Sequence, residues 1–151
     1  MYFEPEYLEP GSAVYAPPAG ALRVLVVDDE TDALRTLLAI LRLERMDARG
    51  IPRPDDALPA VRDFNPDAVI LDINLGRVSG WQVARDIRAE TTPSRPLLIA
   101  LSGMFTRGAD RVLSELAGFN YYMIKPYDPN VLIALLENAQ WSQRVGKYGN
   151  A

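Results

Sequence analysis

Several side chains able to take part in phosphoryl chemistry stand directly after apolar segments of the chain. Asp28 and Asp29 follow the first segment, Asp72 ends a later one, and Ser102 and Lys125 come after two more. The carboxyl ends of parallel strands face the crevice where open α/β sheets bind ligands. Clustered carboxylates repel one another, and a hard divalent cation such as Mg²⁺ relieves that repulsion. A lysine and a hydroxyl beside Asp72 would stabilise a transferred phosphoryl group, so Asp72 is the candidate nucleophile.

The elements that must position these residues alternate between apolar strands and amphipathic helices. The predicted strands are 22–27, 47–51, 68–71, 97–101 and 121–124. The predicted helices are 34–41, 55–64, 80–90, 107–117 and a last one that begins at Pro129. This order predicts an α/β fold with a doubly wound, five-stranded parallel sheet of the flavodoxin-like (βα)5 type. The expected strand order is 2-1-3-4-5, which places the ends of strands 1 and 3 side by side.

The domain is expected to span residues 22–140. Residues 1–21 are rich in proline and carry three glutamates without any lysine or arginine, which is typical of a disordered acidic arm. The aromatic residues of the arm could still dock on a surface or on a partner; they are Tyr2, Phe3, Tyr7 and Tyr15. The last helix is expected to fray between Asn138 and Arg144, and residues 141–151 to form a C-terminal tail.

Composition excludes several classes of chemistry. The chain has no cysteine and no histidine, so disulfides, thiolate catalysis, imidazole bases and histidine-ligated metals are excluded. The net charge is −4, of which the arm carries −3, so nothing favours nucleic-acid binding. No apolar run approaches the ~18 residues of a membrane span, and no signal peptide is recognisable. We therefore expect a cytoplasmic protein without membrane contact.

From Leu22 to about Gln140 the chain resembles the receiver domain of two-component response regulators, including receivers of hybrid histidine kinases. The motifs that carry the resemblance are Asp28-Asp29, Asp72-x-x-Leu75-x-x-x-x-Gly80, Ala100-Leu101-Ser102-Gly103 and Tyr122-x-x-Lys125-Pro126. Each motif alone is weak evidence for the family, but together the motifs follow the order and spacing of the family. The resemblance covers roughly four-fifths of the chain.

The resemblance implies a phosphorylation site with a bound Mg²⁺ or Mn²⁺. Asp72 matches the phosphoacceptor. Asp29 matches the direct metal ligand, Asp28 a ligand through water, and the backbone carbonyl of Asn74 the third protein ligand. These assignments agree with the preference of Mg²⁺ for carboxylate, carbonyl and water oxygens.

The resemblance also implies a conformational switch. Ser102 matches the switch hydroxyl, Lys125 the lysine that pairs with the phosphoryl group, and Tyr122 the aromatic residue that rotates on activation. A core role for Tyr122 remains a close alternative. The peptide bond between Lys125 and Pro126 is expected to be cis.

Phosphorelay signalling is therefore the expected function. A partner histidine kinase or histidine phosphotransfer protein would supply the phosphoryl group, because this chain has no histidine. A downstream protein would bind the face of the fourth helix, fifth strand and fifth helix, where Tyr121 and Tyr127 are expected to be exposed. A homodimer is an open alternative. The chain would not be a turnover enzyme, since only self-phosphorylation and slow autodephosphorylation are implied.

Three residues depart from the family pattern: Gly76, Ser79 and Gly103. Gly76 stands where proline is usual, so the loop after Asp72 should be less rigid. Ser79 and Gly103 are milder changes.

Two alternative functions stay open. An aspartyl-phosphate phosphohydrolase would need a second acid two residues after the nucleophile, where this chain has Asn74. A pseudo-receiver used only for docking would lack a site residue, and none is missing.

Overall fold

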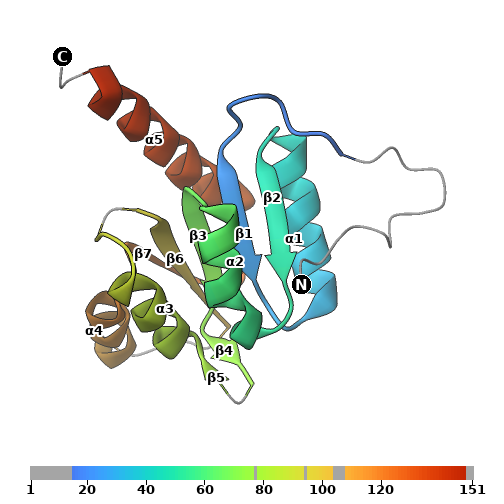
Figure 1. Cartoon of the computed structure of the whole chain (residues 1–151). Helices are drawn as coiled ribbons and strands as arrows, with labels where there is room; N and C mark the ends of the chain where they lie inside the picture. The colour runs from blue at the N-terminus through green and yellow to red at the C-terminus, as the bar shows by residue number, and fades with distance from the viewer. Residues whose placement is uncertain (1–14, 77, 94, 104–107, 149–151) are drawn as a thin grey trace.

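The chain forms a five-stranded parallel sheet with helices on both faces (Figure 1). The structure is a computed structural model and describes residues 15–76, 78–93, 95–103 and 108–148. The strand order is β2-β1-β3-β6-β7, with a separate two-stranded hairpin, β4-β5. Numbered along the chain without the hairpin, this is the order 2-1-3-4-5, so the predicted fold is confirmed.

The bounds of the elements follow the apolar pattern closely. The strands of the sheet are β1 (Arg23–Val27), β2 (Asp47–Ile51), β3 (Ala68–Asp72), β6 (Leu97–Ser102) and β7 (Tyr121–Ile124). The helices are α1 (Thr31–Leu43), the 3-10 turn η2 (Pro54–Asp56), α2 (Ala57–Phe64), α3 (Gly80–Ala89), α4 (Gly108–Ala117) and α5 (Pro129–Tyr148). The hairpin consists of β4 (Asn74–Leu75) and β5 (Val78–Ser79), and the sequence did not predict it.

Alternate residues of each central strand serve two separate cores. In β1, Val24 and Val26 pack with α1 and α5, whereas Leu25 and Val27 pack with α2, α3 and the end of α4. Successive side chains of a strand point to opposite faces, so a strand covered on both sides is apolar throughout. The near-continuous apolar run therefore indicated a central strand, and Figure 1 shows helices on both sides of it.

Helix α1 covers one face of the sheet through a stripe of leucines. Leu34, Leu37, Leu38 and Leu41 are all buried. Their spacing of i, i+3, i+4 and i+7 places them on one side of the helix. This packing fixes the start of α1 close to the end of β1, where Asp28 and Asp29 stand.

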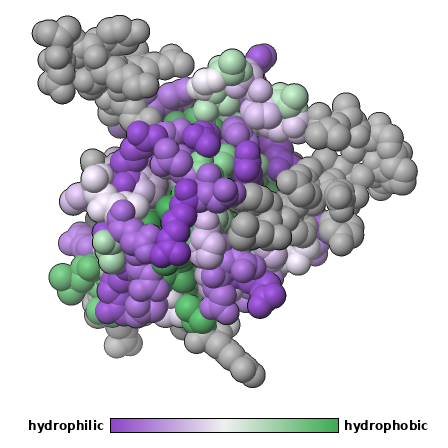
Figure 2. All heavy atoms as spheres, viewed as in Figure 1, coloured by the Kyte–Doolittle hydropathy of each residue, from purple (hydrophilic) through white to green (hydrophobic). Residues whose placement is uncertain are grey.

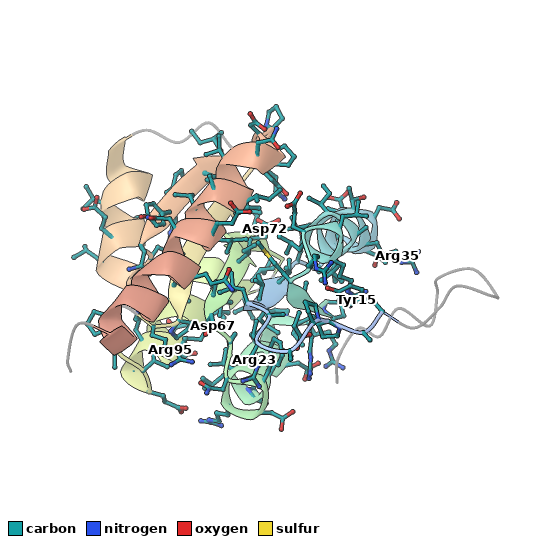
Figure 3. All side chains as sticks on the ribbon, turned by 90° about the horizontal axis from the view of Figure 1, so that it is seen from above. Tyr15, Arg23, Arg35, Asp67, Asp72 and Arg95 are labelled. Carbon is teal, nitrogen blue, oxygen red and sulfur yellow. The ribbon has the colours of Figure 1, made fainter. Side chains whose placement is uncertain are left out.

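The other end of β3 carries a buried acid with a structural role. Asp67 accepts a hydrogen bond from the backbone N–H of Arg23 (2.9 Å) and one from Nη2 of Arg95 (3.2 Å; Figure 3). Asp67 precedes β3, whereas Asp72 ends it, so the two acids lie at opposite edges of the sheet. Asp67 therefore ties strands together and takes no part in the candidate site.

The structure describes part of each predicted terminal segment. The predicted fraying between Asn138 and Arg144 is wrong, because α5 continues to Tyr148. In the predicted arm, the Tyr15 hydroxyl donates to the carbonyl of Met46 (2.8 Å), and Arg42 lies over the Tyr15 ring. Residues 1–14, and the predicted helix start at 107, lie outside the described residues. The domain boundaries remain predictions.

Within the described part of the chain, no helix has both the length and the apolar character needed to cross a membrane. The cytoplasmic location remains a prediction from the sequence.

Candidate functional site

The sheet brings four strand ends together at one edge. β1 and β3 are parallel neighbours, so Asp28, directly after β1, lies next to Asp72 at the end of β3. β6 lies on the other side of β3 and ends at Ser102, and Lys125 directly follows β7 beyond it. The backbone N–H of Lys125 donates to the carbonyl of Ser102 (2.7 Å), which fixes the start of the lysine side chain beside β6.

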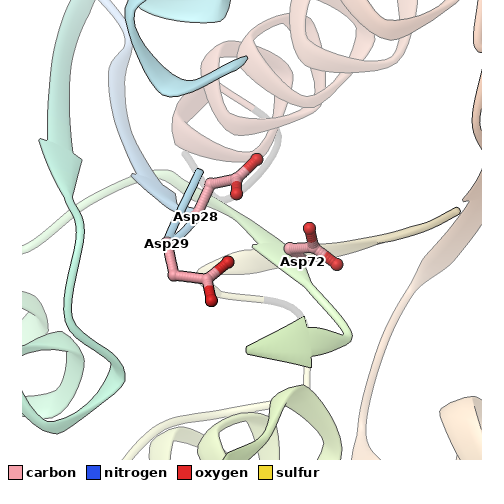
Figure 4. A group of neighbouring side chains, drawn as sticks. All are labelled: Asp28, Asp29 and Asp72. Atoms are coloured by element: carbon pink, nitrogen blue, oxygen red, sulfur yellow. The ribbon is translucent and has the colours of Figure 1, made fainter. Parts of the chain in front are cut away.

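Three carboxylates converge at this edge (Figure 4). One oxygen from each of Asp28, Asp29 and Asp72 lies within 4.8 Å of the others. Asp28 and Asp72 are only 5% and 7% exposed, whereas Asp29 is exposed. The cluster therefore has a buried floor and an open side that solvent or a reactant can enter.

Each buried carboxylate is held in place by a backbone donor. The N–H of Glu30 donates to Oδ1 of Asp28 (2.9 Å), and the N–H of Asn74 donates to Oδ1 of Asp72 (2.9 Å). Both contacts span two residues, which is the usual local turn of an aspartate. The second oxygen of each acid is thereby directed to the interior of the site.

Lys125 joins the two buried acids. Its Nζ lies 3.0 Å from Oδ2 of Asp72 and 3.7 Å from Oδ2 of Asp28. Three carboxylates and one ammonium carry a formal charge of −2, which one divalent cation would balance. The site therefore has the oxygen donors and the charge that suit a hard divalent ion.

The charges of the site shift the pKa values of its members. Burial raises the pKa of Asp28, and the charges of Asp72 and Asp29 act in the same direction. The Glu30 N–H and Lys125 oppose this shift without cancelling it. Burial alone would lower the pKa of Lys125, but its hydrogen bond to Asp72 and the nearby acids raise it above the ordinary value. Lys125 thus stays charged, and Asp28 gives up its proton less readily than an exposed acid.

The segment after Asp72 is a short hairpin that leads into α3. Asn74 and Leu75 pair with Ser79 and Val78, and Gly76 follows β4 at φ +69°. A positive φ suits glycine and is closed to proline, whose φ is fixed near −65°. The departure at Gly76 therefore accompanies a hairpin, and the expectation of a less rigid loop stays a prediction.

Gly80 allows α3 to begin against the end of β3. A Cβ at this position would lie 2.5 Å from the backbone oxygen of Asp72 and 2.7 Å from Cα of Ile73. The N–H of Gly80 also donates to the carbonyl of Ile73 (2.9 Å). Close contact between α3 and β3 thus fixes the backbone that carries Asp72.

The two predicted switch residues lie in different surroundings. Ser102 is buried, at 2% exposure, and pairs in register with Ile124. Tyr122 pairs in register with Ala100, is half-buried and packs against the core on the α2 and α3 side. This packing agrees with a core role for Tyr122 in the described conformation. The predicted cis bond between Lys125 and Pro126 is present.

Two residues near the site were not assigned to it from the sequence. Glu30 holds Asp28 through its backbone N–H, and its charge helps to raise the pKa of Lys125. Tyr127 was expected to be exposed, but it is half-buried against the α1 and α5 core. Burial raises the pKa of Tyr127, and the charge of Asp28 adds to that shift, whereas Lys125 opposes it. Sequence position alone did not show on which side of β7 this tyrosine would pack.

Comparison with known proteins identifies relatives over most of the chain. A family model described as "Response regulator receiver domain" matches residues 24–137. The DNA-binding response regulator MtrA of Mycolicibacterium paratuberculosis is 37% identical over 112 residues, which cover 74% of this chain and 48% of that protein. A probable transcriptional regulator, ycf27 of Porphyridium aerugineum, is 28% identical over 116 residues, 77% of this chain and 47% of that protein. The chain spans about half the length of these curated relatives.

Solved structures give the same picture of the fold. A CheY-like receiver domain protein from Methanospirillum hungatei JF-1 has a TM-score of 0.75 at 21% identity, with 83% of this chain and 98% of that chain covered. The BeF3-activated N-terminal receiver domain of RstA from Klebsiella pneumoniae has a TM-score of 0.70 at 27% identity, with 78% and 97% covered. The similarity to the Methanospirillum hungatei protein shows the fold alone, whereas the similarity to the RstA receiver also includes 27% sequence identity.

Proposed function

Because this chain belongs to the response regulator receiver domain family, we propose that Asp72 accepts a phosphoryl group from a phosphohistidine on a partner protein. The chain is a phosphorylation-dependent receiver of two-component signalling and is not a conventional enzyme. The observation that carries the proposal for Asp72 is its place at the centre of the site. Asp72 pairs with Lys125 on one side and shares the carboxylate cluster with Asp28 and Asp29 on the other.

The proposed step is a displacement at phosphorus. A carboxylate oxygen of Asp72 forms a bond to phosphorus as the bond between phosphorus and the histidine nitrogen breaks. The product is an acyl phosphate on Asp72, and the released imidazole takes up a proton. A divalent cation would supply positive charge beside the phosphoryl oxygens. The donor is a histidine kinase or histidine phosphotransfer protein, since this chain has no histidine.

For the metal we propose Mg²⁺, with Mn²⁺ as a substitute. Asp29 and Asp72 would bind it directly, Asp28 through water, and the backbone carbonyl of Asn74 would complete the protein ligands. The convergence of the three carboxylate oxygens within 4.8 Å supports this assignment. Their net charge with Lys125 also supports a divalent ion over a monovalent one.

Lys125 and Ser102 are the proposed partners of the phosphoryl group. Lys125 is already 3.0 Å from an oxygen of Asp72 and keeps its charge, so it would move its hydrogen bond to the phosphoryl oxygens. Ser102, at the end of β6, would donate its hydroxyl to the same group. We propose that Tyr122 changes its packing in response, as the family resemblance implies.

The proposed output surface lies on α4, β7 and α5. It exposes apolar side chains on all three elements: Val112, Leu113, Leu116, Tyr121, Ile124 and Val131. Figure 2 shows apolar atoms on the outside at the lower left, where Figure 1 places α4. Exposed apolar groups of this kind mark protein interaction sites. We propose that a downstream protein, or a second copy of the chain, binds here. With a charge of −4, we propose no direct nucleic-acid contact by the receiver.

The test is phosphorylation by acetyl phosphate with Mg²⁺. Intact-mass measurement should show one added phosphoryl group on the wild type and none on Asp72→Asn. The matched control is Asp86→Asn, because Asp86 is an exposed acid on α3 that contacts Gln82. A phosphoryl group retained by Asp72→Asn would contradict the assignment. Multiple turnover of phosphate esters by the wild type would instead support the phosphohydrolase alternative, which Asn74 argues against.

A further inference from the structure

The strand β2 lies at one edge of the five-stranded sheet, with β1 on its inner side. The N–H of Asp47 donates to the carbonyl of Leu22, which leads into β1 (2.9 Å), so the backbone groups of Asp47 face inward. Successive backbone groups of a strand point to opposite sides, so those of Met46, Ala48 and Gly50 face outward. An outward row of this kind is a template for pairing with another chain.

Two side chains from other parts of the chain occupy carbonyls on this outer edge. Nε and Nη2 of Arg42, on α1, donate to the carbonyl of Ala48 (3.2 and 2.8 Å). The hydroxyl of Tyr15 donates to the carbonyl of Met46 (2.8 Å). The Tyr15 ring also packs against the guanidinium of Arg42, whose Cζ lies 5.7 Å from the ring centroid. Carbonyls that a neighbouring strand would use are therefore already bonded to side chains.

Residues 15–21, which we name the strap, carry Tyr15 to this position. At the far end of the strap, the N–H of Ala21 donates to the carbonyl of Pro18 (3.1 Å). Gly20 is the third residue of this turn and has φ +75°, a conformation that suits glycine there. Figure 1 shows the strap passing the start of β2 on its way to β1. The strap is thus held at both ends.

The sequence of β2 is complementary to itself. In an antiparallel pair of two β2 edges centred on Ala48, Asp47 of one copy would stand opposite Arg49 of the other. Opposite charges across two strands stabilise their pairing, and both side chains are partly exposed. The N–H of Ala48 in each copy would donate to the carbonyl of Ala48 in the other, which is the carbonyl that Arg42 occupies. A second copy of the chain is therefore the strand that fits this edge.

We propose that the strap and Arg42 block the outer edge of β2 from antiparallel pairing with a second copy of the chain. Covering an edge strand in this way is a known protection against association. The strap then belongs to the folded unit, which starts at or before Tyr15 instead of at Leu22. β2 lies at the opposite edge of the sheet from β7, so this surface is separate from the proposed output surface. The inference does not depend on the phosphorylation of Asp72.

The first test measures self-association of the full chain. The variant Tyr15→Ala/Arg42→Ala, which we name the open-edge variant, removes both side chains from the edge of β2. It is compared with the wild type by sedimentation velocity over a wide range of protein concentration, in EDTA and without a phosphoryl donor. The Kd of the open-edge dimer should be at least roughly tenfold lower than that of any wild-type dimer, because the capped carbonyls become available to a partner strand.

The matched control is Arg85→Ala/Tyr121→Ala, which removes the same two residue types from α3 and β7. Both residues are exposed and lie away from β2, so this variant should associate no more strongly than the wild type. If the open-edge variant does not fold, Tyr15→Ala alone keeps the bond from Arg42 to Ala48. It should then show the same change to a smaller extent.

The second test locates the contact, and it uses the absence of cysteine from the chain. One copy of the open-edge variant carries Asp47→Cys and another carries Arg49→Cys. In the proposed pairing these positions face each other with Cα atoms about 4.5 Å apart, within the range of a disulfide. A mixture of the two copies with a mild oxidant should give a disulfide-linked dimer, and either copy alone should give much less. The same substitutions in the wild-type background should also give little.

Three results would overturn the proposal. One is an open-edge variant, or Tyr15→Ala in its place, that associates no more strongly than the wild type. Another is stronger association without a preference for the mixed disulfide, which would place the contact outside β2. The third is a mixed disulfide that forms as readily in the wild-type background, because the edge would then be free despite the strap.

Discussion

At the scale of single residues, the site is a balance between repulsion and pairing. Asp28 and Asp72 are buried side by side, and Lys125 contacts both. The negative charge of Asp72 disfavours ionisation of Asp28, whereas the ammonium of Lys125 favours it. The pKa of Asp28 stays raised, chiefly by burial, so the pairing with Lys125 only partly offsets the cost of its charge.

This imbalance predicts a pH-dependent cost to stability. An acid whose pKa is higher in the folded state binds protons more readily when folded, so stability increases as pH falls through the folded pKa towards the unfolded value. Without divalent cations, Asp28→Asn should be more stable than the wild type at pH 7 by on the order of 1 kcal/mol. The gain should shrink as the pH approaches ~4, the usual pKa of an exposed aspartate.

Urea unfolding in EDTA at several pH values would measure this gain. Asp86→Asn serves as the control, because it removes an exposed acid and should change stability little. A less stable Asp28→Asn at pH 7 would contradict the prediction, and would mean that the ionised carboxylate stabilises the fold.

At the scale of elements, the contact between α3 and β3 determines where Asp72 lies. Gly80→Ala would place a Cβ 2.5 Å from the backbone oxygen of Asp72, and backbone atoms cannot move aside as a flexible side chain can. We expect a loss of roughly 2–3 kcal/mol in the free energy of unfolding and slower phosphorylation by acetyl phosphate. Gly103→Ala is the control for stability, since no atom of the described residues lies within 4 Å of a Cβ added at this position. Equal stability of the two variants would refute the steric argument.

The hairpin after Asp72 makes a second element-scale prediction. Gly76 has φ +69°, which proline cannot adopt, so the residue usual in the family should be harmful here. Gly76→Pro should lower the free energy of unfolding by roughly 1–3 kcal/mol, and Gly76→Asn by less, because asparagine tolerates this conformation. Urea unfolding of both variants would measure the difference. A Gly76→Pro protein as stable as the wild type would show that the β4-β5 hairpin does not contribute to the free energy of unfolding.

At the scale of the whole molecule, metal binding and folding stability are linked. A cation that binds the folded chain alone stabilises it by about 2.7 kcal/mol at a concentration of 100 times Kd. We expect Mg²⁺ to raise the thermal midpoint of the wild type and EDTA to reverse this. Asp29→Asn should lose most of the effect at equal Mg²⁺, because Asp29 is the exposed member of the carboxylate cluster. Asp86→Asn should keep it, and an equal response of both variants would remove Asp29 from the proposed ligands.

Much of the architecture was predictable from the sequence, because local patterns carry it. The apolar runs of β1 and β3 are continuous because both faces of these strands are covered, and the leucine spacing of α1 follows from its single buried side. Alternation of such segments leaves few possible topologies. Once the strand order was inferred, the meeting of Asp28, Asp29 and Asp72 followed, since parallel strands end at one edge of a sheet.

Other features leave no periodic pattern in the sequence. The β4-β5 hairpin is local, but its strands of two residues are too short for any periodicity, and α5 continues to Tyr148 where its sequence indicated fraying. Further features depend on contacts between residues far apart in the chain. Tyr127 packs inward because α1 and α5 meet beside it. The Arg88 guanidinium joins α3 to the carbonyl of Gly118 and to Oδ1 of Asn120, which lie 30 and 32 positions further on. The sequence by itself thus determined the fold and the chemistry of the strand ends, whereas tertiary packing decided how the loops and helix ends around them are held.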